Sequence, residues 1–271
     1  MAFGCEYMIT REELAKIKEL RKINLYYAEK EYLQHIFLNA TAKYPKSFVF
    51  KGGTCLRICY GLERASEDLD FNMNISLAKV RELVRKCLKD FELLNIKHSL
   101  YSKKEFAGNI RFEIRFEGPL FSGNPESTNT LKIDFNKAKV HYPVVKVVQK
   151  LFSDVPLFTL VVMDEREILA EKIRALIHRR ESRDLYDLWI LLSRNIGVDE
   201  KLVLLKLKEE KIDVAQFQLP SKQKYERDLK ALVSLLPAYE QVVKEVMLHL
   251  EMIQCVKRLL YKRGTKRLFK K

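Results

Sequence analysis

The sequence reads KGGTCLR at residues 51–57 and, after a loop, DLDF at residues 68–71. The first stretch follows a β-prone run at residues 47–51 and leads into a short predicted helix, residues 54–60, that should end at Gly61. Two consecutive glycines let the backbone approach a ligand closely, and the amides at a helix N-terminus favour an anion such as a triphosphate. By itself, a Gly-Gly turn before a helix is usually only a turn.

The second stretch places two carboxylates on one side of a predicted strand. Asp68 and Asp70 alternate with apolar residues, and residues two apart in a strand point to the same face. Their charges repel unless a cation lies between them, and carboxylate oxygens suit Mg²⁺. Asp134, in a predicted strand at residues 130–135, would complete a two-metal site. The structural alternatives are a solvent-facing acidic pair and a hydrogen-bonded aspartate at a strand end.

The N-terminal part of the chain mixes strand and helix patterns. Residues 109–116 alternate strictly between polar and apolar side chains, which predicts a strand antiparallel to the one at 130–135. Thr10 and Glu13 form a predicted capping box ahead of two helices. These helices fall within residues 10–43, and another helix is expected at residues 77–94.

The C-terminal part is helical. Asp164 and Glu167 form a second predicted capping box, after which apolar residues recur at helical spacing. Further helices are predicted at residues 182–192, 200–209, 222–236 and 237–260. We therefore predict an α+β fold, with N-terminal helices and a small mixed sheet in residues 1–160 and a helical domain with a basic tail in residues 161–271.

The composition indicates a basic globular protein. The chain has 271 residues and a formal net charge of +14, which favours a polyanionic partner such as nucleic acid over a merely solubilising basic surface. Its five cysteines lack the spacing of a zinc site and are expected to be core thiols in a reducing cytosol. No apolar run approaches the ~18 residues of a membrane span, and the N-terminus lacks the pattern of a signal peptide. We expect a cytoplasmic protein.

The motifs together resemble a known family. A Gly-Gly-Thr helix start followed by D-x-D on a strand resembles the polymerase-β-like nucleotidyltransferases. The longer string, KGGTCLR followed by Gly61, Arg64, Ser66 and DLDF, is similar to the AbiEii family of nucleotidyltransferase toxins, which includes the mycobacterial MenT enzymes. The later strings ILAEKIRAL at 168–176 and SRDLYDL at 182–188 resemble that family's downstream motifs. The resemblance covers about residues 45–195 and implies a polymerase-β-like core followed by a helical domain.

The resemblance also implies roles for individual residues. Asp68 and Asp70 would bind metal, and Lys172 and Asp184 would join them as catalytic residues. Which of Asp134, Asp184 and Asp187 is the third acidic residue stays open. The predicted nucleotide-binding residues are Lys51, Gly52, Gly53, Thr54, Arg64, Ser66 and Lys172.

Each of these residues also has a structural alternative. Lys172 could be a solvated lysine, although its apolar neighbours suggest a partly buried charge that needs an anion. Asp184 and Asp187 lie three apart on one helix and could form an ion-pair network. The arginines available to them are Arg174, Arg179 and Arg180. Arg64 and Ser66 could simply order the loop before the D-x-D strand.

The expected activity is transfer of a nucleoside monophosphate from an NTP, with Mg²⁺ or Mn²⁺ as cofactor. The resemblance implies a toxin that modifies a tRNA 3′ end and has a cognate antitoxin. A cluster of basic residues near the C-terminus also favours RNA, unless it is only a solvated tail: Lys257, Arg258, Lys262, Arg263, Lys266, Arg267, Lys270 and Lys271. The alternatives are a nucleotidyltransferase that modifies a small molecule or a protein, and a non-catalytic RNA-binding protein.

Overall fold

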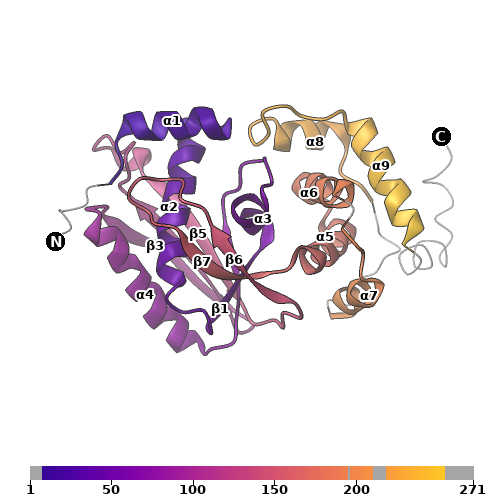
Figure 1. The fold of residues 1–271 in the computed structure, drawn as a ribbon, viewed down its shortest axis with the longest axis horizontal. Helices are drawn as coiled ribbons and strands as arrows, with labels where there is room; N and C mark the ends of the chain where they lie inside the picture. Colours follow the sequence, from indigo (N-terminus) through magenta and orange to yellow (C-terminus); the bar gives the residue numbers. More distant parts are fainter. Residues whose placement is uncertain (1–7, 195, 210–217, 254–271) are drawn as a thin grey trace. The chain divides into compact units, whose positions relative to one another are not determined.

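The computed structural model describes residues 8–194, 196–209 and 218–253. The chain forms two compact units, Met1–Met163 and Asp164–Lys271. The first contains a sheet and the second is helical in its described residues (Figure 1).

The first unit is built on one mixed sheet. Seven strands of its described residues lie in the order β3-β4-β5-β2-β1-β7-β6. β1 is antiparallel to β2 and parallel to β7, and β2 is parallel to β5. The remaining neighbours, β3 with β4, β4 with β5 and β6 with β7, are antiparallel. The strands are β1 (Phe48–Lys51), β2 (Leu69–Met73), β3 (His98–Phe106), β4 (Asn109–Phe116), β5 (Asn129–Asn136), β6 (Pro143–Val148) and β7 (Phe158–Met163).

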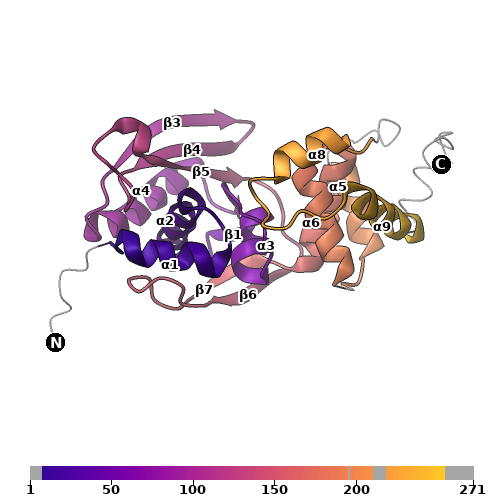
Figure 2. The same ribbon diagram turned by 90° about the horizontal axis from the view of Figure 1, so that it is seen from above.

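Helices cover one face of strands β3, β4 and β5. In Figures 1 and 2, α2 and α4 lie on the same side of these strands. Phe91 of α4 packs with its ring 4.5 Å from that of Phe116 of β4, and Phe37 of α2 lies 6.3 Å from Phe71 of β2. The core of the unit therefore lies between these helices and the sheet. The helices are α1 (Arg11–Arg21), α2 (Leu25–Thr41), α3 (Gly52–Tyr60) and α4 (Leu77–Leu93).

Several predicted helix ends are confirmed. Thr10 caps α1 by accepting a hydrogen bond from the Glu13 amide, and the Glu13 carboxylate accepts one from the Thr10 amide in return. Gly61 ends α3 with a φ of 68°, a left-handed conformation that glycine adopts without steric cost. α3 begins at Gly52, two residues before the predicted start, and Asp68 lies just ahead of β2.

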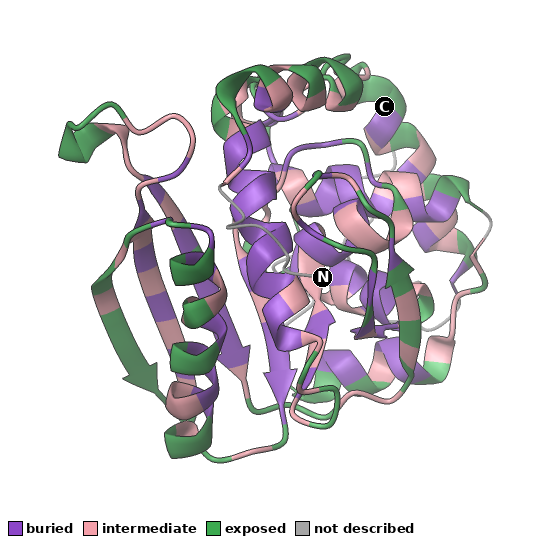
Figure 3. Cartoon of the chain, turned by 60° about the vertical axis from the view of Figure 1, so that its left-hand side comes forward, coloured by how far each residue is buried: buried purple, intermediate pink, exposed green. Residues whose placement is uncertain are grey.

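Three strands were not predicted, and each lacks an alternating pattern in the sequence. β3 is an edge strand with most of its residues exposed, visible as the green strand beside α4 in Figure 3. β6 is the other edge, and β7 is a short run of mostly apolar residues. Edge strands bury little on either face, so the period of two that identifies a half-buried strand is weak in them.

The second unit is helical over its described residues. It comprises α5 (Glu165–Arg179), α6 (Ser182–Ser193), α7 (Glu200–Glu209), α8 (Lys222–Leu229) and α9 (Tyr239–Met252). Asp164 caps α5 by accepting a bond from the Arg166 amide, whereas the Glu167 carboxylate pairs with Lys206. α8 ends earlier than predicted. The predicted helical residues 254–260 and the basic tail lie outside the described residues. None of the described helices is long and apolar enough to cross a membrane.

Candidate active site

The Gly-Gly turn brings the start of α3 against Asp70. Gly52 has a φ of 79°, and a Cβ at this position would lie 2.5 Å from Oδ2 of Asp70. Glycine is therefore required twice, for the left-handed backbone and for the close approach of the carboxylate. The N-cap residue Lys51 makes no side-chain capping bond to the amides of α3. The helix N-terminus thus has the capacity to bind an anion beside a strand-borne carboxylate.

Thr54 ties this helix start to the segment that carries Asp68. Its hydroxyl donates to the backbone carbonyl of Asp68 and also lies 2.8 Å from the Ser66 hydroxyl. Gly53 packs against the Arg64 guanidinium so closely that a Cβ there would overlap it. Arg64 is 2% exposed and donates to the Ala65 carbonyl. Thr54, Arg64 and Ser66 therefore hold the glycine turn and the Asp68 backbone together.

A buried ion pair orders the loop between α3 and β2. Arg57 donates to Glu31 of α2 at 2.7 Å and to the backbone carbonyls of Glu63 and Arg64. Burial raises the pKa of Glu31, but the guanidinium groups of Arg57 and Arg21 outweigh it and hold the pKa below its usual value. Gln34 of α2 donates to the carbonyls of Ser66 and Glu67. These contacts fix the loop on α2.

The pairing of the strands aligns five charged residues across the sheet. Lys51 of β1 is opposite Asp70 of β2, and Asp70 is opposite Asp134 of β5. Asp134 is in turn opposite Arg111 of β4, which is opposite Lys104 of β3. Partners in register project to the same face of a sheet. The row therefore runs Lys104–Arg111–Asp134–Asp70–Lys51, with two carboxylates flanked by cations.

Arg111 holds Asp134 through both of its carboxylate oxygens. Nε of Arg111 lies 2.8 Å from Oδ1, and a terminal nitrogen lies 3.0 Å from Oδ2. This bond raises the pKa of Arg111, and the charges of Asp68 and Asp70 act in the same direction because they lie nearby. Among the described residues, no group of three or more Asp, Glu, His or Cys side chains is arranged to hold a metal ion. The predicted metal ligand Asp134 is instead bound to a guanidinium in this structure.

The predicted residues of the second unit form a buried ion cluster. Nζ of Lys172 lies 2.8 Å from Oδ1 of Asp184 and 2.6 Å from Oδ2 of Asp187. Arg179 donates to both oxygens of Asp184. Burial raises the pKa of Asp184, but Lys172 and Arg179 outweigh it and hold the pKa well below its usual value. Asp184 and Asp187 thus take part in an ion-pair network whose cations are Lys172 and Arg179.

Arg111 was not among the predicted site residues. It lies 23 positions before Asp134, and the only signal for it is its place on the strand predicted to pair with residues 130–135. Glu31 and Gln34, which order the loop before β2, were also missed. Their helix shows no motif that distinguishes them from other polar residues.

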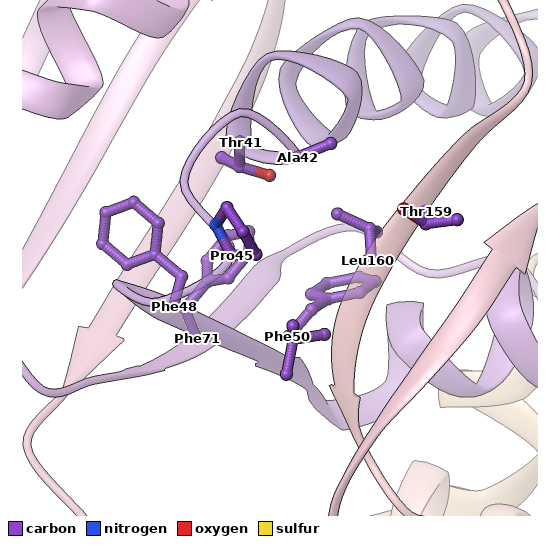
Figure 4. Close-up of a pocket in the computed structure, with 9 residues that line it drawn as sticks. Thr41, Ala42, Pro45, Phe48, Phe50, Phe71, Thr159 and Leu160 are labelled. Atoms are coloured by element: carbon purple, nitrogen blue, oxygen red, sulfur yellow. The ribbon is translucent and has the colours of Figure 1, made fainter.

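A small cavity lies elsewhere in the first unit. Thr41, Phe48, Phe71 and Leu160 are among its lining residues, and its volume is about 10 Å³ (Figure 4). This volume holds about one water molecule. The cavity adjoins the start of β1, whereas Gly52 follows the end of that strand. It is too small to hold a nucleotide.

Comparison with solved structures shows the class of fold. The chain is similar to MenT4, a nucleotidyltransferase toxin from Mycobacterium tuberculosis, with a TM-score of 0.66 and 20% identity over 96% of each chain. It is also similar to JHP933 from Helicobacter pylori, with a TM-score of 0.55 and 21% identity over 90% of this chain and 97% of the other. The fold is that of the nucleotidyltransferase toxins.

The sequence itself establishes the family. Residues 36–247 match the model of the nucleotidyl transferase AbiEii toxin, type IV toxin–antitoxin system. The match spans most of the chain, so this protein belongs to the AbiEii family of nucleotidyltransferase toxins. No curated protein sequence matches the chain. The predicted family and the α+β fold are thereby confirmed.

Proposed function

We propose that this protein transfers a nucleoside monophosphate from an NTP to a hydroxyl group of an RNA, with Asp68 and Asp70 holding Mg²⁺ or Mn²⁺. The observation that carries the proposal is the contact between the Asp70 carboxylate and Gly52 at the N-terminus of α3. It brings a metal-binding group and an anion-binding group together, and a metal–triphosphate complex requires both.

The residues present fit a divalent cation. Asp68 and Asp70 are half-buried carboxylates two positions apart in the sequence. Mg²⁺ prefers oxygen ligands of this kind. The glycine turn leaves space at Asp70 that any Cβ would fill. When bound, the cation would neutralise charge on the reacting phosphate and on the leaving pyrophosphate.

The chain's own groups would position the reactants. The first amides of α3 would bind phosphate oxygens, and Thr54 and Ser66 would keep those amides fixed relative to Asp68. Lys51 and Arg111 would compensate the charge of the triphosphate from either side of the two carboxylates Asp70 and Asp134. The acceptor oxygen forms a bond to the α-phosphorus as the bond to pyrophosphate breaks, and a carboxylate oxygen of Asp68 or Asp70 takes the hydroxyl proton.

The family's second motif extends the proposal to Lys172 and Asp184. By this motif, Lys172 is proposed to bind the triphosphate. Asp184 is proposed to orient it, because Lys172 Nζ lies 2.8 Å from Asp184 within the second unit. Asp187, at 2.6 Å, shares that orienting role. Substitution of Lys172 by Met should raise the KM for NTP if the lysine binds triphosphate, whereas a purely structural lysine would alter stability alone.

The acceptor is proposed from charge and family together. A net charge of +14 suits a polyanion, and the family comprises toxins of toxin–antitoxin systems. We propose a tRNA 3′ end as the acceptor, a cytoplasmic site of action and a cognate antitoxin as the regulator. A nucleotidylated 3′ end cannot be aminoacylated, which would account for toxicity.

One experiment separates the proposed function from its alternatives. The full-length protein is incubated with α-labelled NTPs, Mg²⁺ and total RNA, and the products are separated by size. The proposal predicts label in RNA of tRNA length and none without Mg²⁺. Label in protein or in a small molecule would instead identify another acceptor, and RNA binding without label transfer would identify a non-catalytic RNA-binding protein.

A further inference from the structure

The face of strands β3, β4 and β5 opposite the helices carries a basic surface. Ile110, Ile114 and Phe116 of β4 are buried toward the helices, so the alternate residues Arg111, Glu113 and Arg115 project to the other face. The register adds Lys104 of β3 and Lys132 of β5 to this face, because they are opposite Arg111 and Glu113 respectively. We call it the open face, and its basic residues are Lys104, Arg111, Arg115 and Lys132.

A bulge in β3 adds an aromatic side chain to the open face. The pairing of β3 with β4 shifts between Leu100 and Ser102, so Tyr101 is displaced from the regular alternation. The guanidinium of Arg115 lies 3.8 Å from the centre of the Tyr101 ring. Because Arg115 projects to the open face, the Tyr101 ring lies there too, and it remains 59% exposed.

The open face is continuous with the candidate active site. The row Lys104–Arg111–Asp134–Asp70 crosses four adjacent strands, each pair in register. Arg111 neutralises the charge of Asp134. On the open face of the three strands, Glu113 is then the acidic residue that remains beside the basic residues Lys104, Arg115 and Lys132. A basic track with an exposed aromatic ring is the combination with which proteins bind single-stranded nucleic acids.

We infer that the open face binds single-stranded RNA and guides its end toward Asp70. This inference rests on the proposed function, since it names the surface that holds the acceptor. The cations would contact successive phosphates, and the ring of Tyr101 would stack on a base. A rigid duplex is a poorer fit because its bases are paired and cannot stack on Tyr101.

The test uses two adjacent lysines of β3 that project to opposite faces. Lys104 is opposite Arg111 on the open face, whereas Lys103 is opposite Phe112 and projects toward the helix side. The full-length variants Lys104→Glu combined with Lys132→Gln, Tyr101→Ala and the control Lys103→Glu are titrated with a fluorescent single-stranded RNA oligonucleotide and with its duplex. Binding is measured by anisotropy at several salt concentrations, and binding of a fluorescent NTP analogue is measured in parallel.

We expect only the variants of the open face to lose affinity for single-stranded RNA. The double variant should bind the single strand about tenfold or more weakly, and the slope of log K against log salt should fall by about 1.4, since each phosphate contact contributes about 0.7. Tyr101→Ala should lose about fivefold or more. Lys103→Glu should bind within about twofold of the wild type, and the NTP analogue should bind all variants equally.

The inference would be overturned by wild-type binding in the double variant, by an equal loss in Lys103→Glu, or by tighter binding of duplex than of single strand. A wild type that binds no single-stranded RNA would also overturn it. If label transfer to RNA persists while the open-face variants bind normally, only this inference fails. If the wild type transfers no label to RNA but the open face still binds RNA, the proposed function fails alone.

Discussion

Two clusters of carboxylates and cations in this protein differ in what surrounds them. In the first unit, Asp70 lies half-buried beside the glycine turn, in a row whose cation Arg111 is 43% exposed. In the second unit, Asp184 and Asp187 are fully buried with Lys172, whose side chain is 9% exposed. Both clusters contain carboxylates and cations, but Asp70 is partly exposed beside the glycine turn, whereas Asp184 and Asp187 are fully buried.

The difference shows how burial assigns a role to a charged residue. A buried carboxylate must be paired within the protein, because removing one partner leaves an uncompensated charge at low dielectric. A half-exposed carboxylate beside backbone amides can exchange solvent for a metal and an anion at smaller cost. The first cluster is therefore suited to ligands, and the second orients Lys172 and stabilises the helices around it.

In the first cluster, substitution of Asp70 should slow nucleotidyl transfer far more than substitution of Asp134. Asp70→Asn should lower the rate of nucleotidyl transfer about 10³-fold or more, because it removes a proposed metal ligand. Asp134→Asn should lower it by only about tenfold, since Arg111 already binds that carboxylate. Single-turnover transfer assays provide both rates. Equal losses would place Asp134 among the metal ligands, as the sequence pattern predicted.

The second prediction concerns the buried cluster. Lys172→Met should lower the free energy of unfolding by about 3–5 kcal/mol, because it removes a buried cation that pairs with two buried carboxylates. The matched control is Lys222→Met, which breaks an ion pair with Glu240 that is more than half exposed and should change the free energy of unfolding little. Urea denaturation measures both. Similar losses in the two variants would contradict the claim that burial makes the ion pairs of Lys172 important for stability.

The third prediction tests the glycine turn. Gly52→Ala should lower transfer about 100-fold, because its Cβ would displace the Asp70 carboxylate. Gly123 has a φ of 88°, and a Cβ added there would meet nothing within 4 Å. Gly123→Ala therefore carries a similar backbone cost of about 1–2 kcal/mol without that contact. Comparable stability but unequal activity of the two variants is expected, and equal activity would refute the role of the turn.

The smallest expected effect is a pH dependence of stability. The pKa of Asp184 is lower in the folded protein than its usual value of 3.8. As the pH falls below this value, the unfolded chain gains a proton before the native protein does, so the stabilisation present above it is lost. Between pH 5 and pH 3, wild type should lose about 1 kcal/mol more than Asp184→Asn. Parallel curves in urea titrations would argue against the charged pairing of Asp184.

The sequence pattern predicted those parts of the fold that have one buried face. β4 was predicted with its observed ends because its residues alternate between the core and the open face. β3 was not predicted because it is an exposed edge strand. β7 was not predicted because a short apolar run does not distinguish a strand from a helix. Helix α8 was predicted too long, since residue spacing alone does not show where a helix stops packing.

The candidate site was predictable where it depends on local motifs. The contact of Gly52 with Asp70 follows from one turn and one strand, 18 positions apart, that the motif specifies together. The pairing of Arg111 with Asp134 depends on strand register, and a shift by one residue would have sent Arg111 to the core face. Lys172 was predicted to be a partly buried charge that needs an anion, but its pairing with Asp184 and Asp187 depends on how α5 and α6 pack.

We expect Asp70 and the glycine turn to bind a metal–nucleotide complex together. The most direct test of this binding is calorimetric titration of the full-length protein with a non-hydrolysable NTP analogue in the presence and absence of Mn²⁺. Wild type should bind the analogue much more tightly with Mn²⁺ than without it, and Asp70→Asn should lose that difference while remaining folded. If Asp70→Asn kept the Mn²⁺-dependent affinity, Asp70 would not be a ligand of the metal that binds with the nucleotide.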